Sequence, residues 1–175
     1  MTEPSWYAAF ATAATVLTAA GLAKAARPAD TARALGAGGL PAREWMVRAG
    51  SGVEVSIGLA ALIAGGGLTA ALVAISYSAL AAFVAVALLR DTPLSSCGCF
   101  GEPDTPPTIL HVVINVLLSV TAWMAFAHPV DGLPAVIAAD PSQGLVLAGL
   151  IGLATYAVVT ALTALPRLSA IGASR

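Results

Sequence analysis

Long apolar stretches separated by short polar connectors run through the whole chain. Five stretches are long enough for helices that cross the hydrocarbon core of a bilayer, which takes about 20 residues. They cover residues 6–23, 45–64, 68–89, 108–127 and 144–165. Basic residues, glycines and prolines separate them, as is usual where helices end. The pattern predicts an all-α integral membrane helical bundle with about five transmembrane helices, in a single domain over residues 1–175.

The connectors differ in their own helical tendency. Residues 31–35, in the polar connector after the first stretch, favour a short interfacial helix, and residues 133–139 favour a shallow interfacial segment. The connector at residues 92–107 contains four prolines and the run Ser95-Ser96-Cys97-Gly98-Cys99. Proline removes a backbone donor and interrupts helices, so this connector is predicted to be the least helical part of the chain.

Composition supports lipid as the main partner of the chain. Of the 175 residues, 58% are hydrophobic and 10% are charged, whereas soluble domains carry roughly 25% charged residues. The formal net charge is -1, which gives no support to a nucleic-acid partner. We therefore expect a protein embedded in a lipid bilayer and no nucleic-acid binding.

The basic residues predict how the chain is oriented in a cell membrane, plasma or inner. With the five spans above, all of them fall on one side: Lys24, Arg27, Arg33, Arg43, Arg48, Arg90, Arg167 and Arg175. Short loops rich in Lys and Arg stay in the cytoplasm. The expected topology is N-terminus outside and C-terminus in the cytoplasm, with the Cys-Gly-Cys connector at the cytoplasmic face.

Cys97 and Cys99 are the only cysteines, and only Gly98 separates them. A disulfide needs Cα atoms about 4.4–6.8 Å apart, so the backbone between them must bend, and glycine allows that bend. Such a ring should be strained, and strained, exposed disulfides tend to be the catalytic ones. This pattern favours a redox couple in a loop whose hinge is Gly98, Phe100 and Gly101.

Two other interpretations of the cysteines stay open. They could be buried small hydrophobic side chains, or soft ligands of a metal site formed by Cys97, Cys99 and His111. The redox interpretation needs no metal and no bound cofactor. A thiol relay normally uses a second cysteine pair, which this chain lacks. A membrane quinone is the candidate to replace it.

Glu54 is the one acidic residue predicted to lie inside the membrane. An acid at that depth is costly and usually marks a functional site with a partner. Lys24, at the same-side end of the first span, is the expected partner. A structural ion pair that fixes helix packing and a proton-handling role are both compatible with this pattern.

His111 and Asn115 lie one turn apart on the fourth span and share a helix face. We expect His111 to be an interfacial polar side chain rather than a ligand, and Asn115 to form a hydrogen bond across helices. Aromatic residues near span ends are typical anchors in the headgroup region. Those expected in this role are Trp6, Tyr7, Trp45 and Trp123.

Several motifs follow one another at intervals that resemble one family. They are Gly21-Leu22-Ala23-Lys24, Arg27-Pro28, Leu35, Leu40-Pro41, Glu54 with Gly58, Cys97-Gly98-Cys99-Phe100-Gly101, and Asn115. The series resembles the methylamine-utilisation MauE family, within the broader MauE/DoxX group of redox-associated membrane proteins. The resemblance covers residues 8–125, and the Cys-Gly-Cys-Phe-Gly run is its most specific part.

The resemblance implies a DoxX-like four-helix core plus one further helix at residues 144–165. It also implies a role in the maturation of disulfide-containing exported proteins, alongside thioredoxin-like partners. Matches to the family pattern occur at Lys24, Glu54, Cys97, Cys99 and Asn115. A basic residue often precedes that asparagine in the family, whereas this chain has Ile114. An anion-binding step at that position is therefore not carried over, and neither is methylamine as a substrate.

The sequence thus favours a membrane thiol–disulfide redox protein in which Cys97 and Cys99 react and Lys24, Glu54, His111 and Asn115 support them. The expected partner is a thioredoxin-like protein or an exported cysteine-containing client. Two functions of other classes remain as alternatives. One is transport or handling of a soft metal or small molecule, and the other is a non-catalytic membrane assembly factor.

Overall fold

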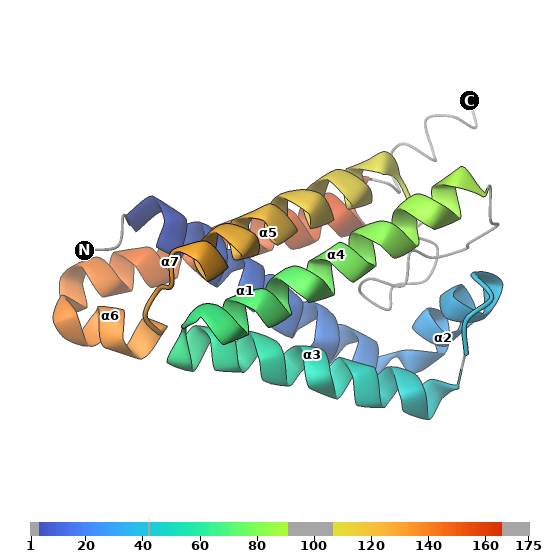
Figure 1. Ribbon diagram of the computed structural model, residues 1–175, viewed down its shortest axis with the longest axis horizontal. Coiled ribbons are helices and arrows are strands. Elements are labelled where there is room, and N and C mark those ends of the chain that lie inside the picture. The colour runs from blue at the N-terminus through green and yellow to red at the C-terminus, as the bar shows by residue number, and fades with distance from the viewer. Residues whose placement is uncertain (1–3, 42, 91–106, 166–175) are drawn as a thin grey trace.

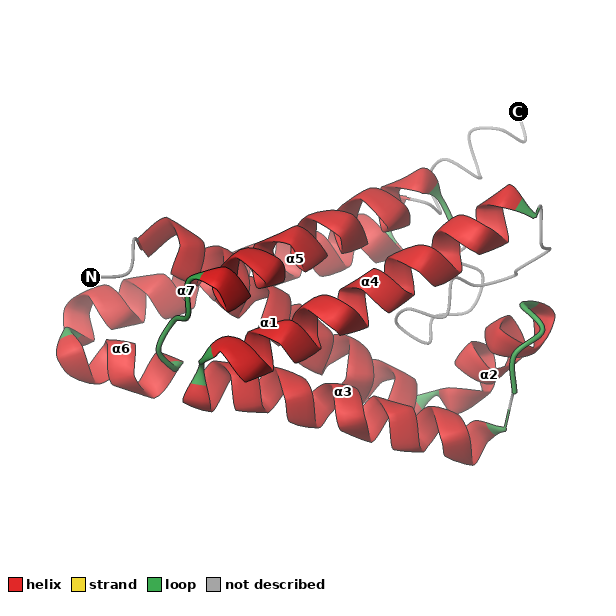
Figure 2. Cartoon of the chain, in the orientation of Figure 1, coloured by secondary structure: helices red, strands yellow, loops and turns green. Residues whose placement is uncertain are grey.

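The computed structural model describes residues 4–41, 43–90 and 107–165. Within these ranges every regular element is a helix (Figures 1 and 2). The helices are α1 (Pro4–Ala26), α2 (Pro28–Ala37), α3 (Glu44–Ala64), α4 (Gly67–Leu89), α5 (Ile109–Ala127), α6 (Leu133–Ala139) and α7 (Pro141–Thr163). The predicted all-α fold is confirmed.

Five of these described helices, α1, α3, α4, α5 and α7, are long and apolar enough to cross a membrane. They coincide with the five predicted spans, with ends that differ by a few residues. The short helix predicted at residues 31–35 is longer than expected and forms α2, and the segment predicted at residues 133–139 is α6. The chain is therefore a multi-pass membrane protein with two short helices between its spans.

Helix α1 supplies a larger share of the buried core than any other described helix. Phe10, Val16 and Leu17 are almost fully enclosed, because α1 packs along α3 and also contacts α4, α5 and α7. Tyr7 belongs to this core and is 3% exposed, so its predicted role as an interface anchor is wrong. Its face of α1 is the one that the other helices cover. Trp6, the adjacent residue, is 51% exposed and remains compatible with an anchor role.

Small residues bring α1 and α3 into close contact. A Cβ atom on Gly58 would lie 2.7 Å from the carbonyl oxygen of Ala14, and one on Gly21 would lie 2.8 Å from Val55 Cγ2. Small residues permit such close approach of membrane helices. We call this contact of α1 with α3, through Gly21 and Gly58, the seam.

A tight turn joins α3 to α4 at one end of the molecule. Gly65 and Gly66 have φ values of 65° and 86°, which glycine adopts without steric cost. The Gly66 N–H donates a hydrogen bond of 2.8 Å to the carbonyl of Val130, in the connector between α5 and α6. From this fixed end α3 and α4 diverge (Figure 1), so that their other ends lie apart.

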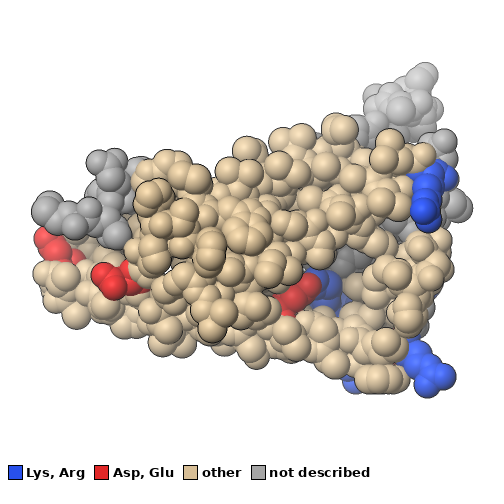
Figure 3. Space-filling model, in the orientation of Figure 1, with Lys and Arg blue, Asp and Glu red and all other residues tan. Residues whose placement is uncertain are grey.

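On the face drawn in Figure 3, the two ends of the bundle carry different charges. In Figure 3 the Lys and Arg atoms gather at the end where α2 lies, and Asp and Glu atoms are seen at the end of the α3–α4 turn. One acidic group lies between the two ends, beside basic atoms in a hollow of this face. The charge separation agrees with the one-sided distribution of basic residues in the sequence. We call the α2 side the basic end.

Candidate functional site

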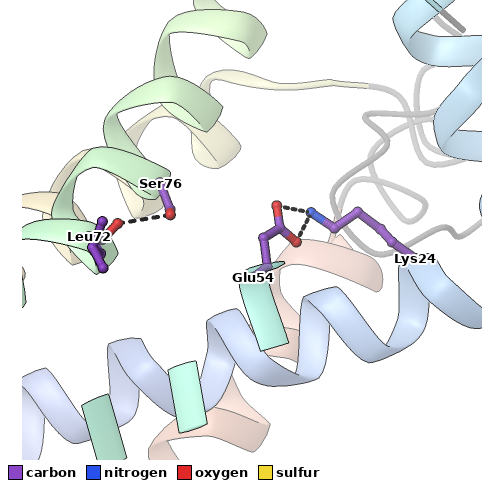
Figure 4. A network of polar contacts seen from close by, with 4 residues as sticks. All are labelled: Lys24, Glu54, Leu72 and Ser76. Atoms are coloured by element: carbon purple, nitrogen blue, oxygen red, sulfur yellow. Dashed lines mark hydrogen bonds and ion pairs between the residues drawn. The ribbon is translucent and has the colours of Figure 1, made fainter. Parts of the chain in front are cut away.

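An ion pair joins α1 to α3 inside the bundle. Lys24 Nζ donates a hydrogen bond of 2.6 Å to Glu54 Oε1, and Glu54 Oε2 lies 2.5 Å from the same nitrogen (Figure 4). The side chains are 6% and 19% exposed. The predicted partnership of Lys24 with Glu54 is confirmed. Glu54 lies ten residues from either end of α3, which is about 15 Å along the helix axis.

The pair lines a crevice between the diverging helices α3 and α4. The crevice has a volume of about 630 Å³, within the size range of small-molecule sites. Its walls are mostly apolar and come from α2, α3 and α4, with Leu35, Met46, Val47, Ile75, Leu80 and Phe83 as the large side chains. The hollow in Figure 3 that holds adjacent acidic and basic atoms opens across the helix axes, between α3 and α4, and not toward an end of the bundle.

Helix α2 closes the crevice at the basic end. Ala34 of α2 packs against Ala87 and Phe83 of α4, and Thr31, Ala34 and Leu35 line the crevice. Pro28 at the start of α2 suits the first turn of a helix, where a backbone N–H has no partner. This short helix therefore covers the crevice at the basic end, and the side between α3 and α4 stays open.

Two serines add polar atoms to the crevice. Ser51 lies one turn before Glu54 on α3, is 2% exposed, and its hydroxyl has no hydrogen-bond partner in the part of the chain that the structure describes. Ser76 faces Glu54 from α4 (Figure 4), with its hydroxyl donated to the carbonyl of Leu72 at 2.9 Å. A buried hydroxyl without a partner costs free energy, so Ser51 offers a polar contact that the described protein does not use.

His111 is fully buried among the helices, so the predicted exposure of its side chain at the interface is wrong. It lies in the first turn of α5, where its Nδ1 accepts a hydrogen bond of 3.3 Å from the backbone N–H of Thr108. That contact holds the ring inside the bundle and caps the helix. An accepting Nδ1 places the proton of a neutral ring on Nε2, which has no partner among the described residues.

Asn115 is also buried, at 4% exposure. Its Nδ2 donates a hydrogen bond of 2.7 Å to the carbonyl of His111, one turn earlier in the same helix. No hydrogen bond to another helix is found for it in the described ranges, so the predicted cross-helix bond is absent there. The bond inside the helix ties Asn115 to the turn that His111 caps.

The predicted redox residues Cys97 and Cys99, and the hinge residues Gly98, Phe100 and Gly101, lie outside the described residues. The structure describes the helix ends that flank their segment. Helix α4 ends at Leu89 and α5 begins at Ile109, both at the basic end of the molecule (Figure 1). No cluster of three metal-ligating side chains occurs within the described ranges.

Sequence reasoning identified the ion pair and missed the crevice around it. Ser51, Ser76 and Gly50 line the crevice, but serine and glycine are frequent in this chain and single positions carried no signal. The one available clue was the position of Ser51, three residues before Glu54 on the same helix face.

Most of the chain matches a known protein family. A family model described as methylamine utilisation protein MauE matches residues 1–128, which include α1 to α5 and therefore the ion pair and the crevice. Helices α6 and α7 follow the matched region. No curated protein and no solved structure matches the chain. Because the model covers well over half of the 175 residues, the chain belongs to the methylamine utilisation protein MauE family.

Proposed function

We propose that this MauE-family membrane protein is a thiol–disulfide redox protein whose reactive couple is Cys97 and Cys99. One observation carries the proposal. The helices that flank the Cys-Gly-Cys segment end and begin at the basic end of the bundle (Figure 1), and α2 closes the Lys24–Glu54 crevice at that same end. The only two thiols in the sequence thus belong to the segment that joins these two helix ends, and the buried charge pair lies in the same bundle, near the middle of α3.

The proposed reaction is thiol–disulfide exchange. A thiolate of the pair attacks a partner disulfide, which forms a mixed disulfide and releases one partner thiolate. The second cysteine then attacks the mixed disulfide, releases the second partner thiolate and closes the Cys97–Cys99 bond. The partner gains two electrons and the pair loses two, and the reverse sequence oxidises a partner. The order in which the two cysteines react is left open.

The proposed partner is a thioredoxin-like protein or an exported protein whose cysteines must be paired. This role would support disulfide formation or maturation of exported proteins, the role that the MauE resemblance implies. Lys24 and Glu54 would orient or tune the site from the crevice, and His111 and Asn115 would fix the first turns of α5, which follows the cysteine segment.

The proposed orientation in the cell membrane follows from the basic end. Positive residues stay in the cytoplasm, so we expect the C-terminus and the Cys-Gly-Cys segment on that side and the N-terminus outside. A reporter fused after Arg175 should be active only in the cytoplasm. A fusion that shows the C-terminus outside would reverse the topology and place the thiols, and their partner, on the extracytoplasmic side.

The redox test uses purified protein poised at a series of glutathione potentials, with mass-tagging of free thiols. We expect a two-electron transition of one intramolecular disulfide. The single variants Cys97→Ser and Cys99→Ser should each lose it, and one of them should trap a partner as a mixed disulfide. Thiols that both stay alkylatable under strongly oxidising conditions, with no trapped partner, would exclude thiol exchange.

The same variants separate the proposal from its alternatives. A double Cys97→Ser, Cys99→Ser variant that keeps full function in cells would indicate a non-catalytic assembly factor. A metal that purifies with the wild type and is lost from the double variant would indicate soft-metal handling by Cys97, Cys99 and His111.

A further inference from the structure

The crevice has features that thiol exchange alone does not need. It is open sideways between two helices that span the membrane, its walls are apolar, and its charged groups lie deep inside it. A molecule that enters from this side comes from the lipid phase. The crevice therefore fits a lipophilic ligand with a polar head that reaches Lys24 and Glu54.

The charges of the crevice select a neutral head group. Lys24 is already compensated by Glu54 at 2.6 Å, so a phosphate or carboxylate head would bring a third charge without its own counter-ion into a poorly solvated place, which is costly. A neutral head with hydrogen-bond acceptors meets no such penalty. Lys24 Nζ has three N–H donors, which leaves at least one beyond those directed at Glu54.

The polar atoms are arranged for a head group that accepts a hydrogen bond and can carry protons. Ser51 contributes a buried hydroxyl with no partner in the described ranges, one turn from Glu54. Around these groups lie the apolar side chains of α2, α3 and α4. A volume of about 630 Å³ holds a substituted aromatic ring and the first units of an apolar tail.

We propose that the crevice between α3 and α4 binds the head group of a membrane quinone. A carbonyl oxygen of the ring would accept hydrogen bonds from Lys24 Nζ or the Ser51 hydroxyl, and the isoprenoid tail would leave through the lateral opening. The inference rests on the proposed function only for its electron source. In the proposed redox reaction, oxidation of the Cys97–Cys99 dithiol to a disulfide yields two electrons and two protons, and these reduce one quinone to one quinol.

The test measures quinone binding with variants that fill the crevice. The probe is a photoreactive azido-benzoquinone with a decyl tail, applied to the full chain in nanodiscs of phosphatidylcholine, with decylubiquinone as competitor. Gly50 lines the crevice and Gly52 does not, and a Cβ on either would have no atom within 4 Å. Gly50→Leu therefore fills the crevice, and Gly52→Leu on the same helix is its matched control.

We expect labelled peptides from α3 and α4 in the wild type, and labelling that decylubiquinone suppresses. Gly50→Leu should weaken labelling roughly tenfold or more, the scale set by displaced methylene groups in a hydrophobic pocket, and Gly52→Leu should label like wild type. Ala79→Leu fills the crevice from α4 and should act like Gly50→Leu. Wild-type labelling in both filled variants would overturn the proposal.

Two further arms separate this inference from its rivals and from the proposed function. Phosphatidylglycerol and diacylglycerol added to the nanodiscs should not displace the probe, and displacement would assign the crevice to a membrane lipid instead. A double Cys97→Ser, Cys99→Ser variant should still be labelled, because the crevice residues are unchanged. If the protein is labelled but its thiols never cycle, the quinone site is supported and the redox proposal is excluded. If the thiols cycle but the protein is not labelled, the redox proposal is supported and the quinone site is excluded.

Discussion

The two faces of α3 use small residues in opposite ways. In the seam, Gly58 lets α1 approach so closely that an added Cβ would lie 2.7 Å from the Ala14 carbonyl oxygen. In the crevice, Gly50 faces open space, and an added Cβ would meet no atom within 4 Å. The two glycines are eight residues apart on one helix, yet one brings backbones together and the other leaves room.

This difference separates stability from binding. Lipid tails are as apolar as leucine, so membrane helices associate through close packing and polar contacts rather than through the hydrophobic effect. The seam supplies that close packing. In the crevice α4 diverges from α3, so these two helices do not pack closely beside the buried charge pair. We therefore expect substitutions in the seam to change stability, and substitutions in the crevice to change ligand binding.

The largest effect is expected for Gly58→Ala in the seam. The new methyl group would overlap the Thr18 side chain and the Ala14 carbonyl, so α1 and α3 must move apart. Overpacking of this kind costs about 1–3 kcal/mol, and the backbone contact favours the upper part of that range. The measurement is the free energy of unfolding of detergent-solubilised protein, titrated with SDS.

Gly52→Ala is the matched control for the seam, because a Cβ there has no neighbour within 4 Å. It should leave the unfolding free energy unchanged or raise it slightly, since alanine favours helix more than glycine does. Equal destabilisation by both variants would show that the seam is not special, and the contrast between the two faces of α3 would fail.

The second-largest effect is expected for the Lys24–Glu54 pair, which joins α1 to α3 and lines the crevice. Removal of one partner of a buried pair costs about 3–5 kcal/mol in soluble proteins, whereas polar couplings measured in membranes average about 0.6 kcal/mol. The Glu54 side chain is 19% exposed in the crevice, so we expect Glu54→Gln to cost roughly 1–2 kcal/mol. The double variant with Lys24→Met should cost less than the two single variants added together.

That double-mutant cycle has a clear contrary result. If Glu54→Gln, Lys24→Met and the double variant all match wild type in unfolding free energy and in quinone labelling, the pair has no role in either region. Strict additivity with large single costs would mean that each side chain acts alone, despite the 2.6 Å contact.

Sequence reasoning predicted the parts of this comparison that depend on local pattern. Five spans follow from stretches of apolar residues, and α6 was predicted at its observed residues. The pairing of Lys24 with Glu54 followed from the cost of an unpaired charge in lipid. These inferences needed only the length and polarity of segments, which one sequence contains.

The crevice could not be predicted in the same way. Its shape depends on how far α4 diverges from α3, which the Gly65–Gly66 turn fixes at one end and α2 at the other. Helices that are apolar on every side carry no periodic signal for the face that meets a neighbour, so Gly50 and Gly58 look alike in the sequence. Tyr7 and His111 were misplaced for the same reason, because polarity indicated their depth but not the neighbours that enclose them.

A smaller effect, of opposite sign, is expected for Gly50→Ala in the crevice. A methyl group there meets no atom within 4 Å, and replacing glycine by alanine inside a helix stabilises soluble proteins by about 0.5–1 kcal/mol. We expect unfolding free energy to rise by up to that amount and quinone labelling to fall less than in Gly50→Leu. Destabilisation comparable with that of Gly58→Ala would mean that the crevice is packed after all.

The smallest effect lies outside both regions and provides their baseline. Asp140 is the N-cap of α7, where it accepts hydrogen bonds from the backbone N–H groups of Gln143 at 3.0 Å and Ser142 at 3.1 Å. The Gln143 N–H, and then the Ser142 hydroxyl, hold the pKa of this carboxyl below its ordinary value of 3.8.

A carboxyl group whose pKa is lowered by folding stabilises the folded state at pH values above its unfolded-state pKa. That stabilisation is lost as the pH falls through its folded-state pKa. Unfolding titrations should therefore show a slight loss of stability below about pH 3.8, and Asp140→Asn should remove that loss while its side-chain oxygen still caps the helix. If Asp140→Asn loses as much stability at low pH as the wild type does, the titrating group lies elsewhere. The unfolding free energies of the seam and crevice variants would then have to be compared at each pH.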